Sequence, residues 1–243
     1  MNFLKTIAPL VDLIYPPRCP LCGTALAAQD GLCAGCWAEL DVPGEPSCAT
    51  CQRPFAGGTG TAGAVCAPCL AEPPLHDGIA AGALYNDPSR RLILSFKHGR
   101  RIALAPMLAR LMSARLPALE GGWLVVPAPL HRRRLWQRGF NQSALLAREI
   151  ARLSGQALCV DGLVRRKPTP QLGGLGRRDR AKALAGAIEV NPGRRSDLAS
   201  ANIVLVDDVM TSGATSNACV KALKKAGADK VIVACFARVI DKI

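Results

Sequence analysis

The sequence lacks several features that would place it in a common class of protein. No stretch approaches the roughly 20 consecutive apolar residues that a membrane-spanning helix needs. The N-terminus has no secretory signal, because Lys5 and Asp12 interrupt its apolar residues and no small-residue cleavage site follows. The usual triphosphate loop, Gly-x-x-x-x-Gly-Lys-Ser/Thr, is also absent. We therefore expect a cytoplasmic protein without a membrane span or this triphosphate loop.

Aromatic residues are scarce as well, at 4% of the chain, whereas cysteine is in excess. Eight of the 11 cysteines form four Cys-x-x-Cys pairs before residue 70. Two residues between cysteines let both sulfur atoms of a tight turn reach one ion, and two such turns complete a closed tetrahedral zinc site. Disulfides belong mainly to secreted chains, so metal binding explains the pairs better. The pairs are Cys19/Cys22, Cys33/Cys36, Cys48/Cys51 and Cys66/Cys69.

Eight thiolates predict two zinc ions. Pairing in sequence order would join the first two pairs in one site and the last two in another, which resembles a double zinc ribbon; an interleaved pairing is the alternative. All four ligands of each ion would be sulfur, so no position is left for a reacting water. We therefore expect the zinc to have a structural or partner-docking role; contact with nucleic acid is a second interpretation, which the net acidic charge of residues 1–76 disfavours, and redox switching is a third.

Charge divides the chain in two. Residues 1–76 contain three Lys/Arg and six Asp/Glu, whereas residues 77–243 contain 28 and 12, and the whole chain carries a formal net charge of +13. A strongly basic second part favours phosphate-rich ligands, either small diphosphates or nucleic acid.

The sequence predicts three segments: an amphipathic helix within residues 1–17, a cysteine-rich domain over 18–74 that ends at the hinge Glu72-Pro73-Pro74, and an α/β domain over 75–243 in which short apolar runs alternate with helical stretches. The fold class we expect for the last is a mainly parallel open sheet with flanking helices. Strands are expected at residues 80–85 (an edge strand), 123–126, 203–206 and 231–237, and helices at 90–96, 102–116, 142–154 and 216–226.

The segment after residue 203 carries the strongest functional signal. An apolar strand is followed by Asp207 and Asp208, whose carboxylates can accept hydrogen bonds from sugar hydroxyls or face a divalent cation. A loop then leads into a helix, where free backbone N–H groups suit a phosphate monoester. Together these features predict a sugar-phosphate site. The loop is Thr211, Ser212, Gly213, Ala214 and Thr215, in which the hydroxyls add donors and the glycine lets the backbone close on the ligand.

Two basic loops are expected to converge on the same end of the sheet. In the first, Arg132, Arg133 and Arg138 follow a proline-rich strand exit and could grip a diphosphate, while His131 is either a proton donor or a surface residue. The second, residues 165–180, is rich in Gly, Pro and cations. It could close over an anionic substrate or be a solvated linker.

These motifs carry a family resemblance. The acid pair and its loop resemble the binding motif of type I phosphoribosyltransferases, in which the acids contact the ribose hydroxyls of phosphoribosyl diphosphate and the loop holds its 5-phosphate. The order of motifs along nearly the whole chain resembles the ComF family of competence-associated proteins. Those motifs are Pro16-Pro-Arg-Cys19, Phe96-Lys97-His-Gly-Arg100, Val126-Pro-Ala-Pro-Leu-His131, Arg138-Gly-Phe-Asn-Gln142, Pro170-Gln171 and Asp207-Asp208.

The resemblance implies a double zinc ribbon fused to a phosphoribosyltransferase domain, a magnesium-dependent phosphoribosyl diphosphate site that includes Lys97, and a link either to uptake or use of external DNA or to nucleotide metabolism. Two other classes stay open. The basic domain could handle single-stranded nucleic acid without catalysis, with Trp123, Trp136 and Phe140 as stacking surface. Alternatively, the zinc ribbons could dock proteins of the DNA-uptake machinery. The sequence identifies neither the acceptor nor the oligomeric state.

Overall fold

The computed structural model describes residues 15–240 except residues 30, 59, 62, 100, 168–183 and 185. The amphipathic helix expected near the N-terminus lies outside the described residues. So does most of the second basic loop, of which only residues 165–167 are described.

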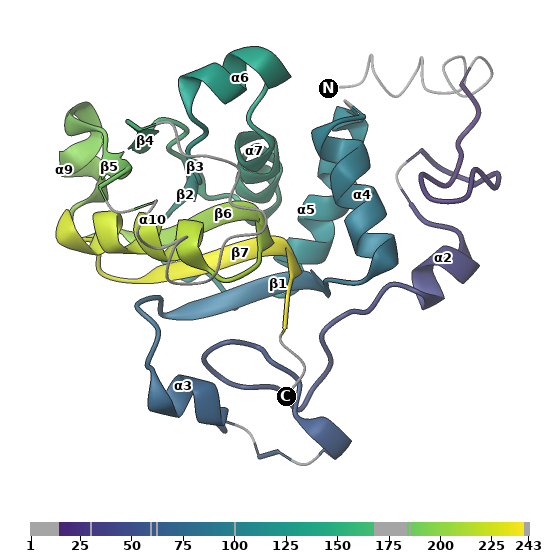
Figure 1. Ribbon diagram of the computed structural model, residues 1–243, viewed down its shortest axis with the longest axis horizontal. Coiled ribbons are helices and arrows are strands. Elements are labelled where there is room, and N and C mark those ends of the chain that lie inside the picture. Colours follow the sequence, from purple (N-terminus) through teal and green to yellow (C-terminus); the bar gives the residue numbers. More distant parts are fainter. Residues whose placement is uncertain are drawn as a thin grey trace.

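A parallel sheet forms the centre of the molecule (Figure 1). All of its strand pairs are parallel, which confirms the expected fold class. The four expected strands are present, with the first at one edge, and a short fifth strand closes the other edge. In sheet order the strands are β1 (Gly78–Leu84), β7 (Val231–Arg238), β6 (Asn202–Met210), β2 (Trp123–Pro127) and β3 (Ala157–Leu158).

Alternate residues of the strands face two separate cores, as a sheet covered on both sides requires. One face packs against α4 (Asp87–Lys97), η2 (Ile102–Leu104), α5 (Ala105–Ser113) and α7 (Gln142–Ser154). The other packs against α10 (Ala214–Lys225), an antiparallel pair of β4 (Leu163–Arg165) and β5 (Ile188–Val190), and α9 (Arg195–Leu198). The short η3 (Pro192–Arg194) leads into α9.

Three local expectations need correction. The strand expected over residues 203–206 continues to Met210, because β7 extends equally far and pairs with it as far as Arg238. The acid pair therefore lies inside the strand. Residues 132–138, expected as a loop, form helix α6 (Arg132–Arg138), which begins after a His131 cap and ends at the left-handed Gly139. The β4/β5 pair was not predicted, since each strand has only three residues.

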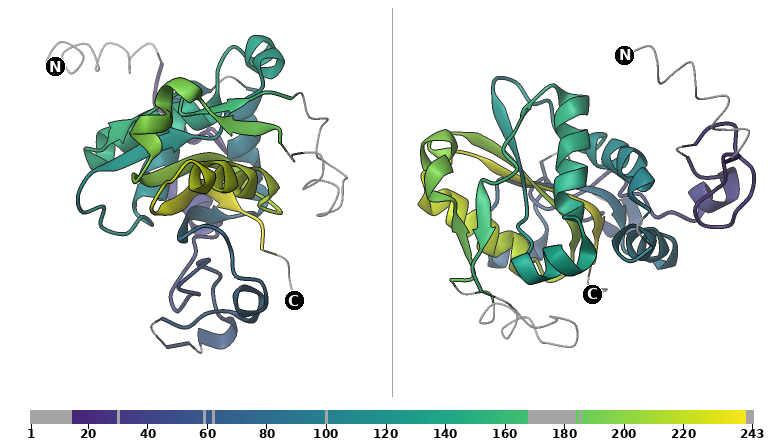
Figure 2. Two further views of the ribbon diagram at one scale, coloured as in Figure 1. Left: turned by 90° about the vertical axis from the view of Figure 1, so that its left-hand side faces the viewer. Right: turned by 90° about the horizontal axis from the view of Figure 1, so that it is seen from above.

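The cysteine-rich part consists of two small modules that pack on opposite faces of the sheet. The first, residues 18–40, contains α2 (Ala34–Ala38) and contributes Cys19, Leu21 and Leu40 to the core beneath α4 and α5. The second, residues 45–71, contains η1 (Ala56–Gly58) and α3 (Ala67–Ala71), and its buried cysteines join the core on the α10 face. In Figure 1, α2 lies beyond α4, whereas α3 lies beyond β1; Figure 2 shows the second module projecting from the sheet.

The cysteine-rich part also covers the exposed edge of the sheet. The Leu84 N–H at the end of β1 donates to the Asp41 carbonyl oxygen at 2.7 Å. The Ala81 N–H donates to Gln52 Oε1 at 3.2 Å, and Gln52 Nε2 donates to the Arg115 carbonyl oxygen at 3.2 Å. An edge strand with unpaired backbone groups invites pairing with other chains, so these contacts protect it.

Within the described residues, no helix combines the length and the apolar character needed to cross a membrane.

Candidate functional site

The eight cysteines gather into two clusters, and the pairing follows sequence order. One cluster contains Cys19, Cys22, Cys33 and Cys36, and the other Cys48, Cys51, Cys66 and Cys69. In each cluster the sulfur atoms lie within 4.8 Å of one another. Four convergent sulfur atoms without a carboxylate suit a tetrahedral structural zinc ion. Each cluster would therefore hold one zinc ion.

The acid pair lies where the sheet narrows. Strand β2 ends at Pro127, opposite Val206, whereas β6 continues. Asp207 therefore has no strand neighbour on that side, and the first turn of α7 fills the gap. Asp207 Oδ1 accepts from Ser143 Oγ at 3.2 Å and from the Asp208 N–H at 2.9 Å. Burial and the neighbouring Asp208 raise the pKa of Asp207 to about 7.

Asp208 faces a lysine from another element. The Lys97 Nζ, at the end of α4, lies 2.7 Å from Asp208 Oδ2. The oxygen is buried, and no described group donates a hydrogen bond to it in good geometry. The contact with Lys97 is therefore mainly ionic.

The predicted phosphate loop opens α10. Gly213 adopts φ +73° as the residue before the helix, and no side chain caps that helix end. A Cβ at this position would lie 3.0 Å from Met210 Cε, so both the backbone conformation and the space favour glycine. Thr211 and Thr215 line the same cavity as Asp207 and Asp208. The volume of this cavity is about 400 Å³. The helix end adds a positive partial charge to this cavity.

Helix α6 determines which arginines reach the cavity. Arg134 and Arg138 are one turn apart on one face and line it, whereas Arg132 and Arg133 are exposed on the other faces and do not. Arg138 Nη1 donates to Gln142 Oε1 at 2.6 Å, and burial lowers the pKa of Arg138. His131 Nδ1 instead accepts from the Arg133 N–H at 3.3 Å, which makes it a helix cap.

Three further cations line the cavity. Lys97 and Arg90 come from α4, and Arg165 lies at the start of the second basic segment. Burial, together with the nearby Arg134, lowers the pKa of Arg165.

Arg134 and Ser143 were not predicted from the sequence as site residues. Predicting a helix over residues 132–138 would have placed Arg134 on the same face as Arg138. Nothing in the sequence around Ser143 indicates that it contacts the acid pair.

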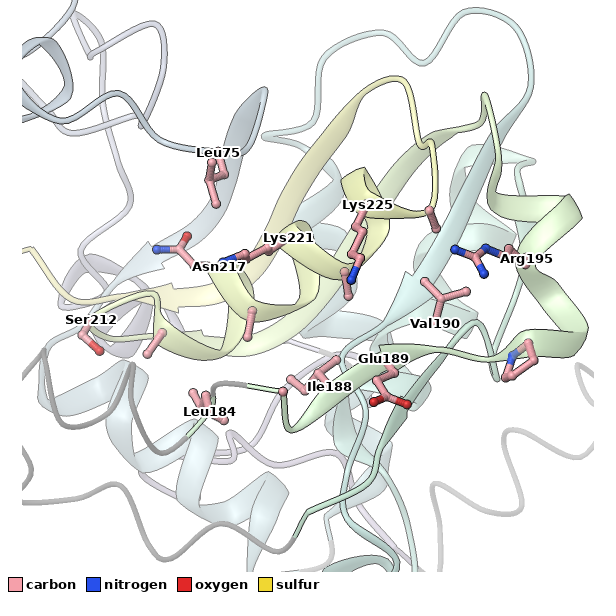
Figure 3. Close-up of a pocket in the computed structure, with 16 residues that line it drawn as sticks. Leu75, Leu184, Ile188, Glu189, Val190, Arg195, Ser212, Asn217, Lys221 and Lys225 are labelled. Atoms are coloured by element: carbon pink, nitrogen blue, oxygen red, sulfur yellow. The ribbon is translucent and has the colours of Figure 1, made fainter.

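A second hollow, of about 710 Å³, lies between α10 and β5 (Figure 3). Apolar Leu184, Ile188 and Val190 line one side, and Lys221 and Lys225 extend from α10. It touches the phosphate loop at Ser212 and Ala214 but does not contain the acid pair.

The acid pair fits magnesium poorly. One oxygen of Asp207 is engaged by two hydrogen bonds, and Asp208 faces an ammonium group. Magnesium prefers near-octahedral oxygen ligands and keeps several waters. A magnesium ion at Asp208 Oδ2 would have to displace Lys97.

Comparisons with known proteins agree with this architecture. Residues 10–70 match the double zinc ribbon domain, and residues 145–243 match the phosphoribosyl transferase domain. The fold, the two cysteine clusters and these matches define a class of protein in which a double zinc ribbon precedes a phosphoribosyltransferase domain.

Relatives share this organisation over nearly the whole chain. The "DNA utilization protein YhgH" of Salmonella typhimurium (strain LT2) is 31% identical over 235 residues, covering 94% of this chain and 100% of the relative. The "Competence protein F" of Haemophilus influenzae is 29% identical over 228 residues, covering 91% of this chain and 96% of the relative. The protein of Escherichia coli (strain K12) with the name "DNA utilization protein YhgH" is 29% identical over 235 residues, covering 94% and 100%. This chain belongs to the ComF family.

Proposed function

We propose that the chain binds phosphoribosyl diphosphate in the cavity at the end of β6 and serves in the uptake or use of DNA. The observation that carries the binding proposal is the meeting of an acid pair, an uncapped helix end and five cations in one cavity of about 400 Å³. The part in DNA uptake or use rests on the names of the relatives.

Each part of the ligand has a chemical counterpart in the cavity. The 5-phosphate would lie on the backbone N–H groups of residues 211–215, since a helix start attracts phosphate. The ribose hydroxyls would donate to Asp207 and Asp208, while Arg134, Arg138 and Arg165 would face the diphosphate.

Transfer to an acceptor would follow from the same placement. The acceptor's lone pair would form a bond to C1 of the ribose as the bond from C1 to the diphosphate oxygen breaks. That electron pair would leave with diphosphate, whose growing charge the guanidinium groups stabilise. The acceptor would release its proton to solvent. Magnesium, which the family resemblance implies, stays a prediction for this ligand.

Titration with phosphoribosyl diphosphate tests the proposal directly. We expect the wild-type protein to bind it and the Asp207→Asn/Asp208→Asn variant to bind at least about tenfold more weakly, because two charged acceptors are lost. The matched control is Asp161→Asn/Asp197→Asn, which removes two carboxylates that both contact Arg194 at the surface. It should bind as the wild type does, with calorimetry as the measurement.

Absence of binding by the wild type, with and without magnesium, would overturn the proposal. Equal binding by all three proteins would place the ligand elsewhere on the chain. If the wild type alone binds tightly, release of diphosphate in the presence of candidate acceptors then separates a transferase from a binding protein.

A second candidate function is handling of single-stranded nucleic acid. One specific observation favours it: Trp136 is 88% exposed on α6, beside the exposed Arg132 and Arg133. Base stacking on an exposed ring among cations is typical of such binding. Trp123, by contrast, is buried, and the Phe140 ring packs 6.2 Å from Phe96. Trp136→Ala should weaken binding of single-stranded DNA in low salt and leave phosphoribosyl diphosphate binding unchanged.

A further inference from the structure

The position of Lys97 is fixed by the fold. It is the last residue of α4, and its neighbour Phe96 is 1% exposed in the core. The Lys97 side chain is 21% exposed and that of Asp208 only 7%. At this level of burial an ion pair is far less screened by solvent than a surface pair. Lys97 is therefore a built part of the cavity.

Cations outnumber acids around this pair. Lys97, Arg134, Arg138 and Arg165 line the same cavity as Asp207 and Asp208. A diphosphate group brings several negative charges close to Asp208, and an unpaired carboxylate there would repel it. Among enzymes that handle diphosphates, a divalent cation often removes such repulsion.

We propose that Lys97 supplies, at Asp208, the positive charge that a divalent cation would otherwise bring, so that the protein binds phosphoribosyl diphosphate without magnesium. This inference rests on the proposed function. An ammonium group has three donors, so Lys97 can keep its contact with Asp208 and still donate to an oxygen of the ligand. A magnesium ion at the same carboxylate would meet the like charge of Lys97 at close range.

The decisive comparison uses the wild-type protein with and without magnesium. A strong chelator would also remove zinc from the cysteine clusters, so magnesium is removed by gel filtration and the zinc content is measured by atomic emission. We expect the dissociation constant of phosphoribosyl diphosphate to change by about threefold or less. A loss of about tenfold or more on removing magnesium would overturn the inference while leaving the proposed function intact.

Variants test whether Lys97 is responsible. Lys97→Met should weaken magnesium-free binding by about tenfold or more, and magnesium should restore most of the loss, because the vacated carboxylate can then take a cation. Lys225→Met is the matched control, since Lys225 is also the last residue of a helix but lines the separate hollow beside β5. It should behave as the wild type does.

The remaining outcomes are distinct. If Lys97→Met responds to magnesium no more than the wild type does, Lys97 is not the substitute cation. If Lys97→Met fails to fold, Lys97→Arg keeps the charge and should still bind without magnesium. If the wild type binds under neither condition, the proposed function itself fails, and the inference fails with it.

Discussion

The two cysteine modules have the same ligands but different surroundings. In the first cluster only Cys19 is buried, and Cys22 is exposed. In the second, Cys48, Cys51 and Cys66 are all buried and belong to the core on the α10 face. Both modules contribute residues to a core of the sheet domain, but the second module buries three of its four ligands and the first only one.

The two modules also support different halves of the candidate site. The first holds α4, which carries Lys97: Arg91 Nη2 donates to the Leu21 carbonyl oxygen at 2.6 Å. The second borders the phosphate loop, because a cavity of about 990 Å³ is lined by Cys51 and Cys69 on one side and by Thr211 and Ser212 on the other. Each module therefore lies next to a different part of the candidate site, on a different face of the sheet.

The largest effect should come from the second cluster. Cys48→Ser removes a buried zinc ligand, so the module loses both its metal and its contacts with the core. We expect the free energy of unfolding to fall by about 3 kcal/mol or more. Cys22→Ser in the exposed first cluster should cost less and leave the sheet domain folded. Denaturant unfolding and zinc content check this, and equal losses in both variants would remove the distinction between the modules.

Gln52 tests how the second module holds the sheet edge. Gln52→Ala removes an acceptor from the Ala81 N–H and a donor from the Arg115 carbonyl oxygen. Leaving a partly buried N–H without a partner should lower the unfolding free energy by about 1–3 kcal/mol. The rate of hydrogen exchange at the Ala81 amide should rise as well. Unchanged exchange would mean that solvent already reaches this strand.

Acid should loosen the second module through His76, which lies in the segment joining it to β1. Burial, with help from Arg238, lowers the pKa of His76 to about 4, below the ordinary value near 6.5. The unfolded chain then binds more protons than the native one between these values, so stability falls as pH drops through this window. The loss at pH of about 5.5 should be near 1 kcal/mol. His76→Asn should show a shallower pH dependence in thermal unfolding; parallel profiles would contradict this.

The smallest effect is expected at the first module. Arg91→Met removes the hydrogen bond to Leu21 but keeps an apolar stem, so stability should fall by about 0.5–1.5 kcal/mol. Because α4 carries Lys97, ligand affinity should fall too, while hydrogen exchange in the second module stays unchanged. A change in the second module would show that the two are coupled through the sheet.

Much of this architecture could be predicted from local patterns. The apolar runs gave the four main strands, since a buried parallel strand needs nearly continuous apolar residues. The cysteine spacing predicted two zinc sites, and only the sequential pairing needed the structure. The domain boundaries and the roles of the site residues stay predictions.

Other features depend on contacts between distant segments. The end of β6 at Met210 is set by the length of β7, and the ion pair of Lys97 with Asp208 joins residues from two elements on either side of β2 in the sequence. Arg132 and Arg133 correctly indicated that this segment is basic, but their conformation was not predicted. They lie on a capped helix of seven residues, which turns them away from the cavity.

The covered edge of β1 has a consequence for synthesis. Asp77, just before β1, donates its backbone N–H to the Val231 carbonyl oxygen, and the two residues are 154 positions apart in the sequence. An apolar strand therefore leaves the ribosome long before β7, its neighbour in the described sheet, exists. Both cysteine modules are already complete by then, because their last ligand is Cys69. Zinc loading during translation would let them shield β1 from other nascent chains until β7 arrives.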